Sequence, residues 1–268
     1  MPTPLELLSD PVSQIILAMY ALMFAWESLL PARTLPPLRF WKIRGIAMFF
    51  IYFFLSSYLP LLWGAHLTAF QLFDLTALNT LGGTLVGILL YELGLYLWHR
   101  TLHHSDVLWR VFHQMHHSAE RIDIPSAFYF SPADMIGFTF LGSLCLTLIV
   151  GLSPQATTLT LLITTFFSMF QHANIHTPRW LGYIIQRPES HTVHHAKGIH
   201  GYNYSDLPVF DILFGTFNNP KTYEHETGFY TGASFRIWDM LLFRDVSQEE
   251  VKSEKRTGTA LKRKATAP

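Results

Sequence analysis

The chain has 268 residues, half of them hydrophobic and only 14% charged, and its mean hydropathy of +0.23 is higher than that of an ordinary soluble domain of this size. The formal net charge is zero, so the overall charge does not indicate a nucleic-acid partner. The single cysteine, Cys145, excludes an internal disulfide and any cysteine-rich zinc or iron–sulfur site.

Five apolar segments are predicted to cross a membrane, because each approaches the roughly 20 residues that a helix needs to span the hydrocarbon core. In chain order they are residues 12–30, 45–63, 81–98, 132–151 and 155–171. Only three residues separate the last two, which suits a hairpin turn. The pattern predicts an all-α fold, an integral membrane helical bundle with about five hydrophobic spans.

The distribution of basic residues predicts the orientation of this bundle. With five spans, residues 31–44, 99–131 and 172–268 lie on the same side of the membrane. All nineteen lysines and arginines fall in these three segments, and positive charge marks the cytoplasmic side. We therefore expect the N-terminus outside and the C-terminus inside. Every histidine except His66 is also cytoplasmic, so the histidines can meet in a helical, histidine-rich cap.

Ten histidines form four closely spaced groups that are typical of a metal site. Within each group, spacings of three and four residues place imidazoles on one helix face, and neutral imidazole is a good ligand for iron, zinc or copper. Ten ligands exceed the capacity of one ion, so two ions with about five ligands each are predicted. The candidates are His99, His103, His113, His116, His117, His172, His176, His191, His194 and His195. The other histidines are expected to be structural.

Glu92 is the one acidic residue that we single out as a catalytic candidate. It lies inside the third predicted span, seven residues before His99 and on the same helix face. An ionisable group at that depth is costly and points to a function. It is expected either to orient a ligand histidine or to bind the metal directly; the alternative is a carboxylate paired with a buried donor for packing. Asp211 is expected to brace a helix.

Three histidine motifs carry a resemblance to a known family. They are HRTLH, HQMHH and HTVHH, in this order, and the later stretch NYSDLPVFDILFGTF also fits. Over about residues 85–220 the chain resembles the fatty acid hydroxylase / sterol desaturase superfamily of membrane histidine-box di-iron oxygenases. It departs from the family pattern at Ser205, where glycine is usual, and at Phe210, where tryptophan is usual. Neither position is a histidine, so the departures concern the subfamily more than the chemistry.

The resemblance implies a catalytic domain at residues 81–220. Transmembrane helices at 1–80 would precede it, and a cytoplasmic segment with a disordered basic tail at 221–268 would follow. It further implies two non-haem iron ions and O₂ as co-substrate. Together they would hydroxylate or desaturate a C–H bond of a membrane lipid, such as a sterol or fatty acyl chain. The chain has no haem or flavin motif, so an external cytochrome b5-, ferredoxin- or rubredoxin-type protein is expected to supply the electrons. A bacterial inner membrane is favoured, with the endoplasmic reticulum as the alternative.

Other functions remain open at this stage. The Glu92–His99–His103 run also resembles alkylglycerol monooxygenase, which cleaves ether lipids. A bis-histidine haem electron carrier is possible, although adjacent imidazoles cannot both serve one haem iron as axial ligands. A metal carrier without catalysis is the third alternative, but carriers usually hold ions at mid-membrane. Two further stretches, 179–185 and 235–243, are predicted to be interfacial amphipathic segments or to pack into the cap.

Overall fold

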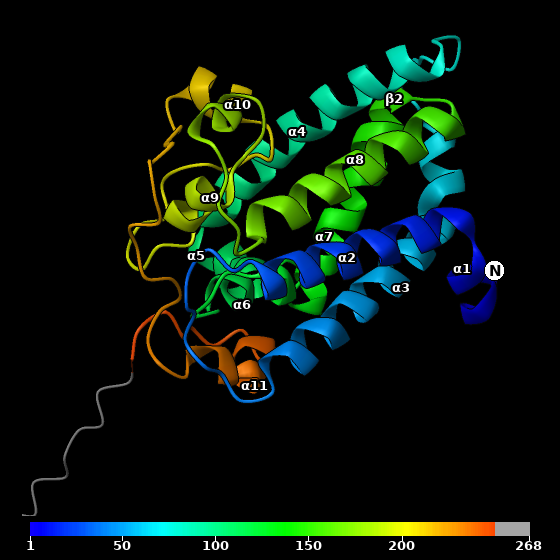
Figure 1. Ribbon diagram of the computed structural model, residues 1–268. Helices are drawn as coiled ribbons and strands as arrows, with labels where there is room; N and C mark the ends of the chain where they lie inside the picture. Colours follow the sequence, from blue (N-terminus) through cyan, green and yellow to red (C-terminus); the bar gives the residue numbers. More distant parts are fainter. Residues whose placement is uncertain (250–268) are drawn as a thin grey trace, which may run out of the picture.

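The computed structural model describes residues 1–249, and it is almost entirely helical. Five long helices run side by side and form a bundle (Figure 1). They are α2 (Pro11–Leu29), α3 (Trp41–Ala69), α4 (Thr80–His104), α7 (Pro132–Ser143) and α8 (Pro154–His172). The N-terminus and α1 (Pro4–Ser9) lie at one end of the bundle, and the short helices and loops of the cap gather at the other end. The predicted all-α membrane-type bundle is confirmed.

Most of these helices begin with the same local signal, a capping side chain followed by proline. Thr3, Asp10, Ser131 and Ser153 each accept a hydrogen bond from a backbone N–H of the first turn, and the next residue is proline in each case. The cap satisfies an otherwise unpaired donor, and proline at the first helical position has no N–H to satisfy. The sequence therefore fixes where α1, α2, α7 and α8 start.

Among the described residues, four helical segments are long and apolar enough to cross a membrane. They are α2, α3, α4 and Pro132–Ile149, in which the π-helix η3 (Leu144–Ile149) continues α7. The fifth predicted span forms α8, which has 19 residues but lower hydropathy because it contains five threonines. The structure thus shows the helix, while its passage through the membrane remains a prediction. The protein is an integral membrane protein by these features.

Small residues let α4 and α8 approach closely, and these two helices carry three of the candidate histidines. A Cβ atom built at Gly83 would lie 2.8 Å from Ala156 Cβ, and one at Gly87 would lie 2.5 Å from Thr160 Oγ1. Glycines four residues apart form this kind of contact face in membrane helices. The two helices are therefore held close together about three turns before the histidines begin.

At the far end of the bundle, two short parallel strands join the α3–α4 loop to the α7–α8 turn. Strand β1 (Phe73–Asp74) pairs with β2 (Val150–Gly151), with Phe73 opposite Val150 and Asp74 opposite Gly151. This link closes the end of the bundle that is distant from the histidines.

The cap consists of short helices that pack on the other end of the bundle. After α4 the chain forms α5 (Asp106–Leu108), the π-helix η1 (Trp109–His113), α6 (Gln114–His117) and η2 (Ile124–Ser126). After α8 it forms η4 (Arg179–Tyr183), α9 (Pro188–His194), α10 (Pro208–Phe214), η5 (Ala233–Phe235) and α11 (Ile237–Leu241). A second apolar core, which includes Trp41, Met115, Tyr129, Phe229 and Met240, attaches the C-terminal part to the bundle.

The two stretches predicted to be interfacial point large apolar side chains outward. Trp180 in η4 is 62% exposed, and Trp238 in α11 is 78% exposed. They do not pack into the cap through these side chains, which favours the interfacial interpretation. The predicted basic tail, residues 250–268, lies outside the described part of the chain.

Candidate metal centre

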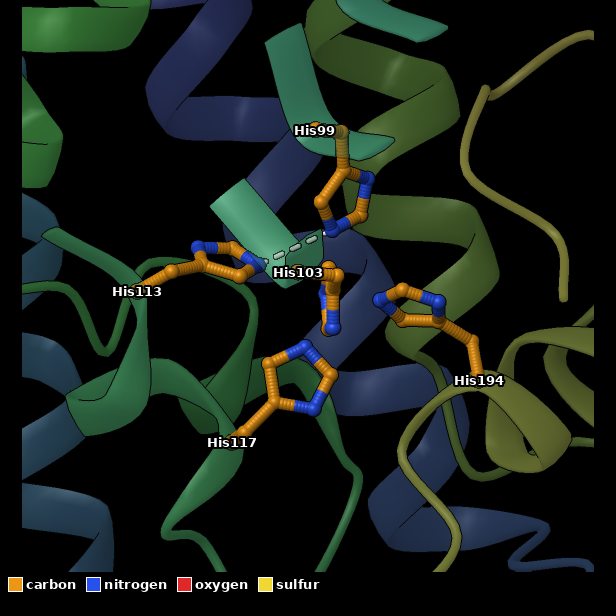
Figure 2. A group of neighbouring side chains, drawn as sticks. All are labelled: His99, His103, His113, His117 and His194. Carbon is orange, nitrogen blue, oxygen red and sulfur yellow. Dashed lines mark hydrogen bonds between the residues drawn. The ribbon is translucent and has the colours of Figure 1, made fainter. Parts of the chain in front are cut away.

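Nine of the ten predicted histidines gather in two groups inside the cap. The ring nitrogens of each group lie within 4.8 Å of one another. The first group contains His99, His103, His113, His117 and His194, and the second contains His116, His172, His191 and His195. Figure 2 shows the five imidazoles of the first group, which come from different parts of the chain and point toward one centre. We expected about five ligands in each of two sites, and the observed division is five and four.

Each H-x2-HH motif contributes to both groups, because neighbouring residues on a helix point in different directions. In the second motif, His113 and His117 belong to the first group and His116 belongs to the second. The third motif is the reverse: His191 and His195 belong to the second group, and His194 belongs to the first. Residues four apart share a face and hence a group.

Within the groups, the ring nitrogens lie at the spacing of ligands around one ion. Nε2 of His99 is 2.9 Å from Nε2 of His113 in the first group. In the second group the Nε2 atoms of His172 and His191 are 3.1 Å apart, and those of His191 and His195 are 3.0 Å apart. A metal ion with bonds of about 2.1 Å to two nitrogens at right angles would hold them about 3.0 Å apart. The spacing therefore fits metal coordination.

Several ring nitrogens of the groups are buried and have no hydrogen-bond partner among the described residues. They include Nε2 of His103, Nε2 of His194 and both nitrogens of His117. Buried polar atoms are rarely left unpaired, and a bound metal ion is one common partner for them. Together with the all-imidazole donor set, these atoms fit two metal ions, one in each group.

Hydrogen bonds to the opposite ring nitrogen fix how four of these imidazoles are turned. In three of them, Nδ1 bonds to a backbone carbonyl oxygen: His99 to Tyr204 at 2.6 Å, His194 to Tyr202 at 2.8 Å and His172 to Ser168 at 2.7 Å. In His113, Nδ1 lies 2.8 Å from Oδ2 of Asp134. Such partners hold Nδ1 as the donor and leave Nε2 free to bind a metal, and a carboxylate partner also makes the ligand more basic.

Burial keeps the cap histidines neutral. Removal from water lowers the pKa of His113 to about 3, with a smaller contribution from His200. Burial likewise lowers the pKa values of His117 and His194 well below the usual range. A neutral imidazole has a lone pair to offer, so these residues are ready to bind a metal at physiological pH.

His176 does not join either group, which corrects the sequence-based assignment. The spacing from His172 to His176 brings two imidazoles together only if the helix continues. Instead α8 ends at His172, and Ala173 adopts an extended conformation. His176 is exposed, and its ring lies 6.2 Å from the ring of Tyr223.

Glu92 is fully buried, but it lies outside both histidine groups. Its Oε2 accepts hydrogen bonds from the backbone N–H groups of Asp206 at 2.9 Å and Leu207 at 3.0 Å. The same loop provides the Tyr204 carbonyl that holds His99. Glu92 is therefore linked to His99 through this loop, and within residues 1–249 it belongs to neither histidine group.

Asp211 braces the same loop, whereas the sequence predicted that it would brace a helix. Its carboxylate accepts hydrogen bonds from the backbone N–H groups of Tyr204 at 2.8 Å and Ser205 at 3.0 Å. Asp134, the partner of His113, was not singled out from the sequence. The sequence does contain a signal for Asp134, since it is the only acidic residue in the apolar stretch 132–151. An ionisable group inside such a stretch is costly, which is the argument that singled out Glu92.

His200 and Trp109 also lie beside the first group, although sequence reasoning left His200 among the structural residues. The His200 ring is 5.3 Å from the His117 ring and 5.6 Å from the Trp109 ring, which in turn is 5.0 Å from the His103 ring. These two residues line an open cavity of about 560 Å³ on the outer face of the cap. His103 lines the same cavity, so the first group borders it directly.

Comparison with known proteins agrees with this site. The fatty acid hydroxylase family description matches residues 84–216, which include twelve of the fourteen histidines. The ornithine lipid hydroxylase OlsE of Rhizobium tropici is 32% identical over 139 residues, which is 50% of this chain and 41% of that protein. The chain thus matches less than half the length of this relative, and no solved structure matches it. With its histidine motifs gathered into two metal-ready groups, the chain belongs to the fatty acid hydroxylase / sterol desaturase superfamily.

Proposed function

We propose that the protein is a non-haem di-iron oxygenase that hydroxylates a membrane lipid. The observation that carries the proposal is the pair of buried, neutral, all-histidine groups on a bundle of apolar helices. The two groups adjoin directly, since the rings of His117 and His195 stack with centroids 4.1 Å apart. Two ions held this close could act together on one O₂ molecule.

The irons would be held by the five histidines of the first group and the four of the second. When bound, they would supply the reductive activation of O₂, in which a lipid C–H, O₂, two electrons and two protons become a lipid C–OH and water. The protein's own residues bury the site and hold the ligands in place. Asp134 turns His113, while Glu92 and Asp211 hold the loop that turns His99.

A lipid substrate is supported by the apolar helices and by the family. The relative's name says that it acts on ornithine lipids, so an amino-acid lipid is the first substrate to test here. The electrons would come from a separate redox protein of the cytochrome b5, ferredoxin or rubredoxin type. We further propose a bacterial inner membrane with the histidine cap facing the cytoplasm, because every basic residue falls on that side of the predicted topology.

The geometry disfavours the haem alternative. A porphyrin has to lie between its two axial imidazoles, and nitrogens that are 2.9 to 3.2 Å apart leave no room for it. An absorption spectrum of the purified protein, without a Soret band, would check this directly.

Mass spectrometry of whole lipids under ¹⁸O₂ tests the proposed function. Cells that express the wild-type chain are compared with cells that express His116→Ala, both with a co-expressed reductase and redox donor. We expect a lipid with one labelled oxygen only in the wild type. A lipid lighter by two hydrogens and without label would instead identify a desaturase, and labelled products in both strains would contradict the assignment of His116 to the metal site.

A further inference from the structure

A cavity of about 340 Å³ lies inside the helical bundle, between α2, α3, α4, α7 and α8. We call it the bundle cavity. A smaller space of about 60 Å³, the histidine cavity, has His99, His113 and His116 in its wall. Tyr52 and Tyr91 line both spaces. The two cavities therefore adjoin at these side chains, and the bundle cavity lies next to the space beside the histidine groups.

The wall of the bundle cavity is rich in hydroxyl groups. Nearly half of its lining residues are serines or threonines. On α8 they occur at three levels, with Thr157 and Thr158 farthest from the histidines, Thr164 and Thr165 in the middle, and Ser168 nearest. At a rise of about 1.5 Å per residue these levels cover about 16 Å. Hydroxyls thus follow the whole cavity and are not confined to one end.

The hydroxyl of a serine or threonine in a membrane helix often donates a hydrogen bond to the backbone carbonyl one turn earlier in the same helix. Ser57, Thr139 and Thr164 do so, at 2.7, 2.7 and 3.1 Å. These bonds use the hydroxyl hydrogen and leave the lone pairs of the oxygen facing the cavity. These hydrogen bonds within the helix explain why the hydroxyls are tolerated, and the hydroxyl oxygens can still accept hydrogen bonds from a ligand.

The polar lining continues to the histidines. The Ser168 hydroxyl donates to Asp206 Oδ2 at 3.0 Å, and Asp206 lies in the wall of the histidine cavity. The other Asp206 oxygen accepts from Gln171 Nε2 at 2.7 Å. Both of the carboxylate's oxygens are acceptors at the point where the two cavities join, so a ligand with N–H or O–H groups finds partners up to the reaction site.

A saturated hydrocarbon would be a poor occupant of such a space. It would displace water from the hydroxyl and carboxylate oxygens without offering them a donor, and unpaired polar groups in a site closed to water are unfavourable. An occupant with amide or hydroxyl groups would pair with them and keep its apolar part against Phe49, Phe128 and Phe138, which also line the cavity.

We propose that the bundle cavity binds the hydrogen-bonding portion of the substrate, and that this substrate is a lipid with amide or hydroxyl donors close to the carbon that reacts. The inference rests on the proposed hydroxylase function and deepens it. It names a polar lipid class in preference to a bare acyl chain or a carotenoid.

A competition binding experiment tests this inference without any turnover. Purified, iron-loaded protein in detergent is incubated with equal amounts of N-palmitoylserine, which carries amide and hydroxyl donors, and palmitic acid, which has the same chain without them. Mass spectrometry then measures which lipid the protein retains. Wild type is expected to prefer N-palmitoylserine about tenfold, which corresponds to about 1.4 kcal/mol of hydrogen bonding.

The valine variant removes the hydroxyls at nearly constant shape, and the serine variant keeps the hydroxyls but removes the methyl groups. The triple variant Thr157→Val/Thr164→Val/Thr165→Val should lose the preference with unchanged iron content, and the corresponding triple serine variant should keep it. Thr101→Val is the control, because Thr101 is exposed on α4 and bonds only to the Leu97 carbonyl. Equal retention of both lipids by wild type, or a preference that survives the valine substitutions, would overturn the inference.

The outcomes separate this inference from the proposed function. Threonine-dependent retention of N-palmitoylserine, with no ¹⁸O incorporated into any lipid after reduction, would support the binding site and contradict the hydroxylase. Incorporation of ¹⁸O into palmitic acid as efficiently as into N-palmitoylserine, by wild type and the valine variant alike, would contradict the polar-lipid inference and support the hydroxylase.

Discussion

At the scale of single residues, histidines that are adjacent in the sequence differ in which group they join. His116 and His117 are adjacent in sequence, yet they belong to different groups. His103 and His104 are also adjacent, and only His103 belongs to a histidine group, while His104 is exposed and bonds to the Arg100 carbonyl of its own helix. The position on the helix face therefore decides the role, and a histidine count alone does not.

His116→Ala and His194→Ala are expected to abolish activity and lower the iron content while leaving membrane insertion intact, because each removes a buried ligand from one of the two groups. Metal analysis of the purified variants, together with the ¹⁸O₂ assay, checks this. His104→Ala is the matched control and should retain both iron and activity. An active His116→Ala protein with full iron would show that the ligand set is wrong.

Glu92 can be tested by two substitutions that differ in hydrogen bonding. Glu92→Gln keeps an oxygen acceptor for the N–H groups of Asp206 and Leu207, so it should retain most of the activity and stability. Glu92→Ala leaves both donors unpaired, at about 1–3 kcal/mol each, and should lower the melting temperature and the iron content. If Glu92→Gln folds and binds iron normally but turns over far more slowly, the charge itself takes part in the reaction.

At the scale of elements, the contact between α4 and α8 places histidines from both helices at one depth. His99 and His103 extend from the end of α4, and His172 ends α8. Gly87 permits the approach, since Thr160 lies where its side chain would be. The register of two helices therefore determines the geometry of ligands that lie more than two turns away.

Gly87→Ala is expected to destabilise the protein by about 1–3 kcal/mol through overpacking against Thr160, and to lower iron retention. Thermal unfolding in detergent measures the change. Gly64→Ala is the control, because no atom lies within 4 Å of the added methyl group, and alanine favours a helix over glycine by about 1 kcal/mol. Equal melting temperatures for the two variants would mean that the close contact is not a constraint.

At the scale of the whole molecule, the topology depends on whether α8 crosses the membrane. If all five long helices cross the membrane, the two ends of the described chain lie on opposite sides. If only the four most apolar segments cross, they lie on the same side. In the fold, α8 runs beside α4 from the end closed by β1 and β2 to the histidine end, which is the arrangement that five spans require.

Cysteine labelling distinguishes these topologies, since Cys145 is buried and can be replaced by serine. Ala77→Cys and Lys221→Cys are exposed positions at opposite ends of the bundle. We expect an impermeant maleimide to label Ala77→Cys from the outside and Lys221→Cys only in inverted vesicles. An added Thr3→Cys should label from the outside with Ala77→Cys, because five spans place both on that side. Labelling of Thr3→Cys from the cytoplasmic side would contradict the predicted orientation of α2.

Much of the fold and site follows from local sequence, and the rest depends on long-range packing. The apolar segments predict the long helices, and spacings of three and four residues predict which histidines share a face. The same rule fails at His176, because it assumes a helix that α8 does not continue. The bonds from Glu92 to the backbone of Asp206 and Leu207 join residues more than 110 positions apart. No local pattern could have predicted that contact, since it depends on how α4 and the 203–207 loop pack.

The sharing of each H-x2-HH motif between both groups has a consequence for how the protein acquires its metal. Under the proposed function, an ion in the first group would order η1 and α6 through His113 and His117, and this would place His116 for the second group. Helix α9 would couple the groups in the same way through His194. Each ion would thus prepare the site of the other, and we expect positive cooperativity in loading. Titration of the iron-free protein with ferrous ion should therefore give mostly empty and doubly loaded molecules, and few singly loaded ones. A cell short of iron would then contain a smaller number of complete enzymes, and not many molecules with a single ion.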